Sequence, residues 1–221
     1  MLGGVPSEEL PLFPLASVVL FPGCHAPLHV FEPRYRQMTA DALQGSRSIG
    51  MVAVRPEHAD DLSGAPPLFE VGCAGFVSEH RQLADGRYHL VLRGTRRFRI
   101  LREIPPRGGR LYRVAEVEAL EEPAVSDPAL LADLRSAVVS RLDDIARRSG
   151  GSDPLPLDQL AALDHAAFAH TLCQALGLPT AEKQGLLEAP DVGERLKNLE
   201  GLLAFHLAAL SGPSSPSQTL H

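Results

Sequence analysis

The apolar residues of this 221-residue chain change their spacing near residue 120. From Leu10 to about Leu120 they mostly alternate with polar residues, as on strands that bury one face. After Glu121-Glu122-Pro123 they recur every three or four residues, as on amphipathic helices. The change predicts an α+β fold, in which a β-rich unit is followed by a small C-terminal α-helical bundle. The expected boundaries are 8–122 for the β-rich unit, 127–211 for the helical unit and 212–221 for a polar, disordered tail.

Within the β-rich unit, local signals predict strands, a hairpin and one helix. Asp85-Gly86 lies between two strand-like runs and predicts a tight hairpin, and Gly94 marks a change of phase that predicts a bulge. Pro33 predicts the start of a helix that ends at Gly45. Its inner face is expected to hold Tyr35, Met38, Thr39 and Ala42. Strands are expected around 10–15, 18–21, 49–54, 69–77, 88–100 and 112–117, the first of them at a sheet edge because of its prolines.

The helical unit shows start signals that specify its helices. Asp127 is expected to cap a first helix, and Thr180 a third. A second, alanine-rich helix is expected from about Leu157 to Leu176. Asp191 with Glu194 predicts a capping box for the last helix. The inner stripe of that helix is expected to consist of Leu196, Leu199, Leu203, Leu207 and Leu210.

A search for catalytic, metal and cofactor motifs predicts none. The chain contains no Walker-type phosphate loop and no G-x-S-x-G motif, and its only lysines are Lys183 and Lys197. Cys24 lies near His25 and His29, but neighbouring strand residues point to opposite faces, and those two histidines would be about 13 Å apart. With Cys73 and Cys173 the chain has three separated cysteines, typical of a reducing compartment. No signal peptide or membrane span is visible, so we expect a cytoplasmic protein.

The segment from Arg81 to Arg113 carries ten arginines and two acids, a net charge of +8, while the rest of the chain carries −14. One interpretation is an arginine coat on the solvent face of a sheet, paired with the acidic helical half. The alternative is RNA binding through this basic stripe. The overall charge of −6 and the absence of an RNA-stacking motif favour the coat. The candidates for the alternative are Arg93, Arg96, Arg97 and Arg99.

Several separate segments, in order, resemble the N-terminal substrate-binding domain of Lon proteases. They are LPLFPLASVVLFPG (10–23), PLHVFEPRYRQM (27–38), DGRYHLVLRGTRRFRI (85–100), VAEVE (114–118) and EKQGLLEAPDVGERLKNLEGLL (182–203). The resemblance covers roughly 10–210 and implies that the β-rich unit is a PUA-like pseudobarrel. Lon proteases continue into ATPase and Ser–Lys protease modules, and the motif search finds neither site here. The resemblance therefore implies a stand-alone, non-enzymatic domain without a cofactor.

The resemblance also implies a function, the binding of unfolded or specific polypeptides, with a protease or chaperone as a further partner. The contact would be an apolar groove between the two units or an exposed strand edge. The candidate contacts are Phe31, Arg34, Tyr35, Arg97 and Phe98. The same residues also fit a scaffold, with Phe31, Tyr35 and Met38 as core between strand and helix. No oligomeric state is predicted.

Overall fold

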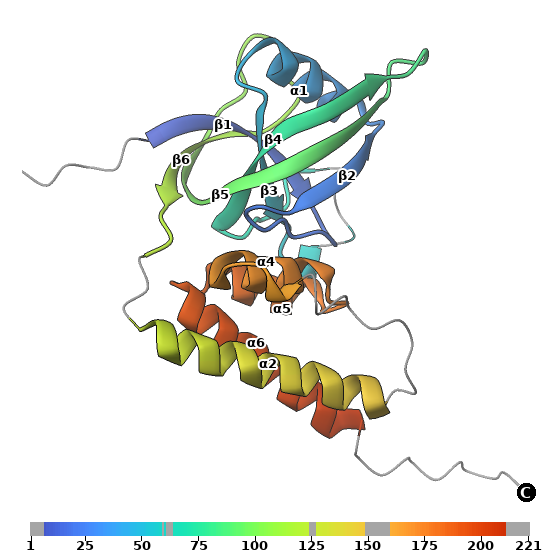
Figure 1. Ribbon diagram of the computed structural model, residues 1–221. Coiled ribbons are helices and arrows are strands. Elements are labelled where there is room, and N and C mark those ends of the chain that lie inside the picture. The colour runs from blue at the N-terminus through green and yellow to red at the C-terminus, as the bar shows by residue number, and fades with distance from the viewer. Residues whose placement is uncertain (1–6, 59, 61–63, 124–126, 149–159, 211–221) are drawn as a thin grey trace, which may run out of the picture.

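The computed structural model describes residues 7–58, 60, 64–123, 127–148 and 160–210. The strands form one unit, and a layer of helices lies beneath it (Figure 1). The strand unit contains β1 (Ser7–Leu15), β2 (His25–Val30), α1 (Pro33–Gln44), β3 (Ser48–Ala53), a 3-10 turn (Pro56–His58), β4 (Val71–Gln82), β5 (Tyr88–Ile104) and β6 (Val114–Leu120). The helical layer contains α2 (Pro128–Arg148), α4 (His165–Ala175), α5 (Thr180–Glu188) and α6 (Val192–Leu210).

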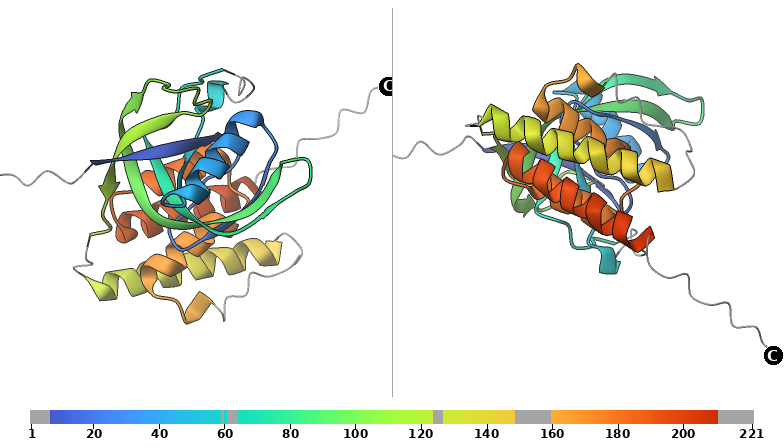
Figure 2. Two further views of the ribbon diagram at one scale, coloured as in Figure 1. Left: turned by 90° about the horizontal axis from the view of Figure 1, so that it is seen from above. Right: turned by 60° about the horizontal axis from the view of Figure 1, so that its bottom comes forward.

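The strands close into a pseudobarrel because β5 is long enough to pair with two different strands along one of its edges. It has 17 residues. Along one edge it pairs with β4, and along the other it pairs first with β2, through Tyr88–Arg93, and then with β6, through Arg97–Ile104. The sheet order β2-β5-β4-β3-β1-β6, with β6 returning to β5, closes the ring, and among the described residues β2 pairs with β5 alone. The left view of Figure 2 shows the ring, with α1 over its opening. The predicted α+β architecture is confirmed.

The prediction that the first strand lies at a sheet edge is wrong. Ser7–Pro11 pairs antiparallel with β6, and Leu12–Leu15 pairs parallel with β3, so β1 lies between two strands. The first half of β1 pairs mainly with β6 and the second half mainly with β3. Pro11 and Pro14 can therefore lie where the backbone N–H that proline lacks would point away from the paired strand.

The strand expected at 18–21 is also absent, although Val19, Leu20 and Phe21 are buried. The backbone N–H of Phe21 donates instead to Oε1 of Gln174 in α4, at 3.1 Å. This segment therefore supplies apolar core and a contact to the helical layer, without joining the sheet.

The local signals of the β-rich unit are confirmed. Helix α1 spans Pro33–Gln44 and buries the four predicted residues, with Gly45 at its end. The hairpin has Gly86 at φ +81°, and Leu83 exchanges backbone hydrogen bonds with Gly86 and Arg87. Pairing between β4 and β5 shifts between Gly94 and Arg96, which is the predicted bulge.

The start signals of the helical unit are confirmed in part. Oδ1 of Asp127 accepts from the backbone N–H groups of Ala129 and Leu130, and Oδ1 of Asp191 accepts from that of Glu194. The cap at Thr180 is wrong, because Thr180 is the first helical residue and Pro179 takes the cap position. The single helix expected up to Leu176 is divided: residues 160–161 are helical, the chain turns at 162–163, and α4 starts at His165, where the side chain of Asp164 accepts from the N–H of Ala167. The expected start at 157 and the tail at 212–221 lie outside the described residues.

One hydrophobic core runs through both units. Its members include Met38 and Leu92 of the barrel and Phe168 and Leu199 of the helices. Helices α4 and α5 lie against the barrel, and α2 and α6 pack side by side beneath them (Figures 1 and 2). Leu210 is the exception in the predicted stripe of α6, since it is exposed while the other four leucines are buried. The division of the chain at 122–127 stays a prediction.

We expect Gly94→Ala to destabilise the protein by about 2 kcal/mol or more. A Cβ at Gly94 would lie 2.2 Å from the carbonyl oxygen of Phe21, which is backbone and cannot rotate away. Gly201→Ala is the matched control, because it lies in α6 with nothing within 4 Å and should stabilise by about 1 kcal/mol. Urea denaturation measures the change in the free energy of unfolding, which should be negative for Gly94→Ala and positive for Gly201→Ala. Equal denaturation midpoints would contradict the close approach at the bulge.

Candidate functional site

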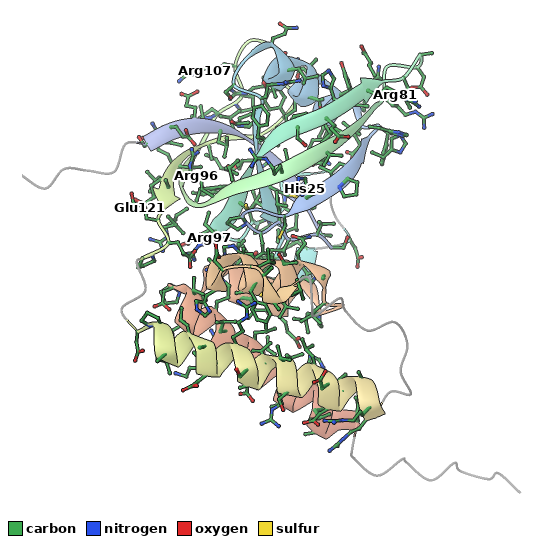
Figure 3. All side chains as sticks on the ribbon, viewed as in Figure 1. His25, Arg81, Arg96, Arg97, Arg107 and Glu121 are labelled. Carbon is green, nitrogen blue, oxygen red and sulfur yellow. The ribbon has the colours of Figure 1, made fainter. Side chains whose placement is uncertain are left out.

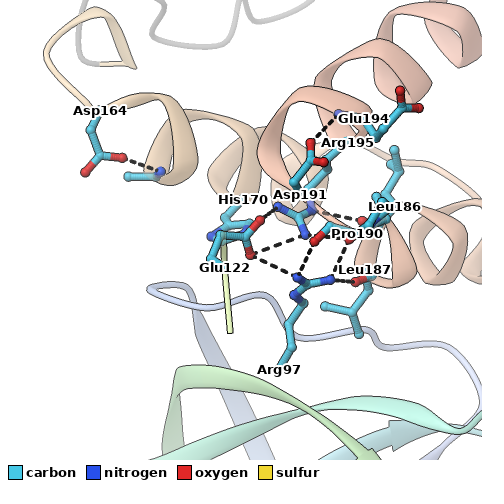
Figure 4. A network of polar contacts seen from close by, with 12 residues as sticks. Arg97, Glu122, Asp164, His170, Leu186, Leu187, Pro190, Asp191, Glu194 and Arg195 are labelled. Atoms are coloured by element: carbon cyan, nitrogen blue, oxygen red, sulfur yellow. Dashed lines mark hydrogen bonds and ion pairs between the residues drawn. The ribbon is translucent and has the colours of Figure 1, made fainter. Parts of the chain in front are cut away.

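Arg97 of β5 lies at the junction between the barrel and the helices. Its side chain is 3% exposed. Its guanidinium donates to the carbonyl oxygens of Leu187 (3.0 Å), Ala189 (2.5 Å) and Pro190 (3.1 Å), where α5 turns into α6 (Figure 4). Arg97 therefore binds the helical unit of its own chain.

Glu122 is shared by two buried arginines. It lies 3.3 Å from Nη2 of Arg97 and 2.7 Å from Nη1 of Arg195 (Figure 4). Arg195 of α6 is fully buried and also donates to the carbonyl oxygens of Leu186 and Ala189. Burial lowers the pKa of Arg97, and the carboxylate of Glu122 acts in the opposite direction. The network joins β5, the segment after β6, and the α5–α6 turn.

His170 completes this junction as a neutral side chain. It is buried, with Nε2 3.9 Å from Oε2 of Glu122. Burial, followed by the positive charges of Arg195 and Arg97, lowers its pKa from 6.5 to about 3. A charged imidazole would add a third cation beside two guanidiniums, so the junction favours the neutral form.

Two further candidates belong to the core. The ring of Tyr35 lies 4.4 Å from that of Phe13, and Phe98 is completely buried. As peptide contacts, Tyr35, Arg97 and Phe98 are therefore not accessible in this structure. Arg34 pairs with Glu32 at 2.9 Å and lies 4.5 Å above the ring of Tyr35, which fixes the turn between β2 and α1.

Phe31 lies outside the core, so its core interpretation is wrong. It is 58% exposed and follows β2 on the solvent side, with its ring 5.8 Å from that of His29. The alternation along β2 explains this position, because Ala26 and Val30 are buried while the odd-numbered residues are exposed. A large exposed phenyl ring next to a strand is a candidate contact for another chain.

The outer edge of β2 has no strand partner within the described residues. The N–H of Gly94 donates to the carbonyl of Cys24, so that carbonyl points toward β5. Alternation then points the backbone groups of Ala26 and Leu28 toward β5 and those of His25, Pro27 and His29 away from it. The edge thus offers three carbonyl acceptors and, because Pro27 has no N–H, two donors.

A hollow of about 450 Å³ lies over the solvent face of β2, β5 and β4. His29 of β2 and His89 of β5 both line it, with their rings in edge-to-face contact and the centroids 4.8 Å apart. Its lining is Pro27, Leu28, His29, Glu79, His80, Arg81, His89, Leu90 and Val91. Sequence reasoning anticipated an exposed edge but assigned it to β1. The proline inside β2 was the signal that could have located it.

Five of the ten arginines of the stripe form ion pairs within the barrel, and the expected pairing with acids of the helical half is wrong for them; Arg97 reaches that half through carbonyl oxygens. The ion pairs are Arg96–Glu8, Arg99–Glu118, Arg102–Glu116, Arg113–Glu103 and, within the hairpin, Arg87–Asp85. Of the nucleic-acid candidates, Arg96 and Arg99 are paired and Arg97 is buried. Arg93 is exposed and has no carboxylate partner in the described part of the chain. Figure 3 shows how Arg81, Arg96 and Arg107 are spread over the barrel.

The cysteines show no activated thiol. Cys24, Cys73 and Cys173 are buried, and burial raises their pKa values to about 11, 12 and 12. Among the described residues no three His, Cys, Asp or Glu side chains are placed to hold a metal ion. The helices in the same ranges are too short or too polar to span a bilayer.

Glu122→Gln should destabilise the protein by about 3 kcal/mol, because it leaves two buried guanidiniums without a counter-charge. Glu116→Gln is the control, since its partner Arg102 is 68% exposed and such a pair contributes at most about 1 kcal/mol. Denaturant unfolding of the two variants measures the difference. Equal losses would show that the junction does not depend on its carboxylate.

His170 should make stability depend on pH. Below pH 6.5 the unfolded chain takes up a proton that folded His170 refuses until about pH 3, so the free energy of unfolding falls as the pH is lowered through this window. The expected loss is about 2 kcal/mol between pH 7 and pH 5. His170→Gln should flatten this slope, and His25→Gln, at an exposed position, should not. A slope that survives in His170→Gln would assign it to other groups.

Comparison with known proteins places this fold. The family model described as "ATP-dependent protease La (LON) substrate-binding domain" matches residues 9–204. The Lon protease of Xanthomonas oryzae is 29% identical over 196 residues, which are 88% of this chain and 23% of that protein. Lon protease 2 of Syntrophobacter fumaroxidans is 30% identical over 212 residues, 94% of this chain and 25% of that protein. The chain thus spans about a quarter of the length of these relatives.

Two solved structures agree. A Lon N-terminal domain protein from Xanthomonas campestris has a TM-score of 0.62 and 28% identity, over 90% of this chain and 98% of that one. The N-terminal domain of Mycobacterium avium complex Lon protease has a TM-score of 0.67 and 23% identity, over 90% and 100%, and shows the shared fold. The match over residues 9–204 and the fold shared with these structures lead to one conclusion. The chain belongs to the LON substrate-binding domain family.

Proposed function

We propose that this chain binds polypeptide without catalysing a reaction, through the open edge of β2 and the exposed face beside it. The observation that carries the proposal is Phe31, 58% exposed at the end of the one barrel strand that has a single partner in the described chain. An extended segment added to this edge would meet the outward carbonyls of β2, while alternate side chains reach the phenyl ring and the hollow. Arg34 positions this turn through Glu32.

The other route, a groove between the two units, has less support. The shared core and the network around Glu122 fill the junction, and Arg97 uses its donors on the α5–α6 turn. Opening it would separate buried guanidiniums from their partners. Binding at the open edge of β2 does not require these buried ion pairs to separate.

The chemistry of the described side chains supports a binding role. The raised pKa values of the cysteines keep them as thiols near neutral pH. Nζ of Lys183 donates to the carbonyl oxygen of Gln174 at 2.8 Å, so this amine is held by the backbone of α4. We therefore infer that any peptidase activity belongs to longer relatives. Unfolded or specific polypeptides are the proposed partners, with a protease or chaperone acting on the same clients in the cytoplasm.

The alternative, RNA binding through the stripe, is weakened by its ion pairs. Arg96 and Arg99 are engaged with Glu8 and Glu118, so a polyanion would have to compete with carboxylates already in place. A competition with single-stranded RNA belongs in the same experiment. Displacement of bound polypeptide by RNA at low salt would favour the alternative.

Phe31→Ala should weaken the binding of a fluorescein-labelled, permanently unfolded polypeptide by about tenfold or more, as for a truncated interface anchor. Fluorescence anisotropy titration measures the change in Kd. Phe205→Ala is the matched control, because Phe205 lies on α6 and is 67% exposed.

Both variants remove an exposed phenyl ring, so their folding should be unaffected, and circular dichroism checks this. Equal affinities of Phe31→Ala and Phe205→Ala would place binding away from β2. Absence of saturable binding by the wild-type chain would end the proposal.

A further inference from the structure

The solvent face of β2, β5 and β4 is arranged in rows that alternate in chemistry. The register pairs His25 with Arg93, and four residues along β2 it pairs His29 with His89. Between these two polar rows, Pro27 pairs with Val91. Neighbouring rows along a strand are about 7 Å apart, and the two polar rows about 13 Å. The face therefore reads polar, apolar, polar from one end of β2 to the other.

Each polar row contains an exposed arginine without a carboxylate partner in the described chain, and the row of Arg93 continues to Phe76 of β4. Arg93 of β5 is exposed beside His25, and Arg81 of β4 is exposed beside His89. Figure 3 labels His25 on β2 and Arg81 near the β4–β5 hairpin. These two differ from the paired arginines of the barrel, and with Glu79 as the acid in the row between them they leave this face with a net positive charge.

The acid on this face lies away from the open edge. Glu79 of β4 pairs in register with Val91, so it belongs to the apolar row. It is separated from the outer edge of β2 by both β5 and β2, about 14 Å at the usual strand spacing. A segment added beside β2 would meet His25, Pro27 and His29 before it met Glu79.

We propose that the β2 edge selects extended polypeptide segments with acidic side chains at positions i and i+4 and an apolar side chain at i+2. This inference rests on the proposed function and names its substrate class. In an added strand, alternate side chains fall into the same rows as those of β2. The two acids would then meet His25 and His29, and the apolar residue would cover Pro27 and the hollow beside Val91.

The distances of Arg93 and Arg81 from an added strand indicate which of the two acidic positions of the peptide should contribute more to binding. Arg93 is on the strand next to β2, about 10 Å from an added strand, which the combined lengths of arginine and glutamate side chains span. Arg81 is one strand further, on β4 like Glu79, so at that distance the fields of these two side chains oppose each other. The acid in the row of His25 and Arg93 should contribute more. Because the acid–apolar–acid pattern is symmetric, it fits parallel and antiparallel addition alike.

The test compares peptides that differ only in charge or in phase. The parent peptide carries Glu at i and i+4 around Leu at i+2, the second carries Lys in place of both Glu residues, and the third has the parent's composition with both Glu residues moved by one position. We expect the parent to bind about tenfold more tightly than the Lys peptide, and the shifted peptide to lose most of that advantage. Raising the salt concentration should reduce the difference.

Variants of the protein locate the effect. Arg93→Glu should reduce or reverse the preference for the Glu peptide over the Lys peptide. Arg107→Glu is the matched control, since Arg107 is also exposed, has no carboxylate partner in the described chain and lies off this face (Figure 3). It should leave the ratio of the two affinities unchanged.

The outcomes separate this inference from the proposed function. Glu and Lys peptides that bind equally, with affinity still lost in Phe31→Ala, would overturn the acidic preference and leave polypeptide binding at β2 in place. Binding of none of the peptides, and of no unfolded polypeptide, would overturn both. A preference for Glu that is equally weakened by Arg93→Glu and Arg107→Glu would reflect net charge alone and would also overturn the inference.

Discussion

The junction between the barrel and the helices depends on one carboxylate that pairs with two buried cations. Glu122 lies between Arg97 and Arg195, and the remaining donors of both guanidiniums are directed to carbonyls around the α5–α6 turn. Separating the barrel from the helical layer would leave these buried charges unpaired, which costs several kcal/mol of free energy, on the order of 3 or more. The barrel and the helical layer therefore act as one body. The polypeptide partner that we propose would then bind on the outside of that body, where the edge of β2 is open in the described chain.

The open edge follows from how β5 divides its pairing. One edge of β5 is used first by β2 and then by β6, and the change occurs at the bulge beside Gly94. Gly94 also exchanges backbone hydrogen bonds with Gly23 and Cys24, where the chain enters β2. The bulge that lets β6 close the ring thus also fixes the start of β2, which has no second strand neighbour in the described part of the chain. Closure of the barrel and exposure of β2 have the same cause.

Local chemistry made part of this fold predictable. Pro33, the Asp85-Gly86 turn and the caps at Asp127 and Asp191 were identified because each signal acts within a few residues. The errors concern long-range pairing. The place of β1 between β3 and β6, the exposure of Phe31 and the partners of the arginines depend on which strands become neighbours. Periodicity cannot give that information, because alternation along a strand does not name the strand beside it.

The arginine run shows how pairing changes the meaning of a sequence pattern. Along the chain it resembles a polyanion site, but β1 and β6 bring Glu8, Glu116 and Glu118 against it. What remains on the β2 face is two rows about 13 Å apart that hold Arg93 and Arg81, with Pro27 and Val91 between them and Glu79 at the β4 end of that middle row. A nucleic acid strand, with a phosphate about every 3.4 Å along a duplex, would place charge against Pro27 and Val91 as well. A polypeptide can place carboxylates at alternate rows and an apolar side chain between them, so its two-residue repeat matches the face.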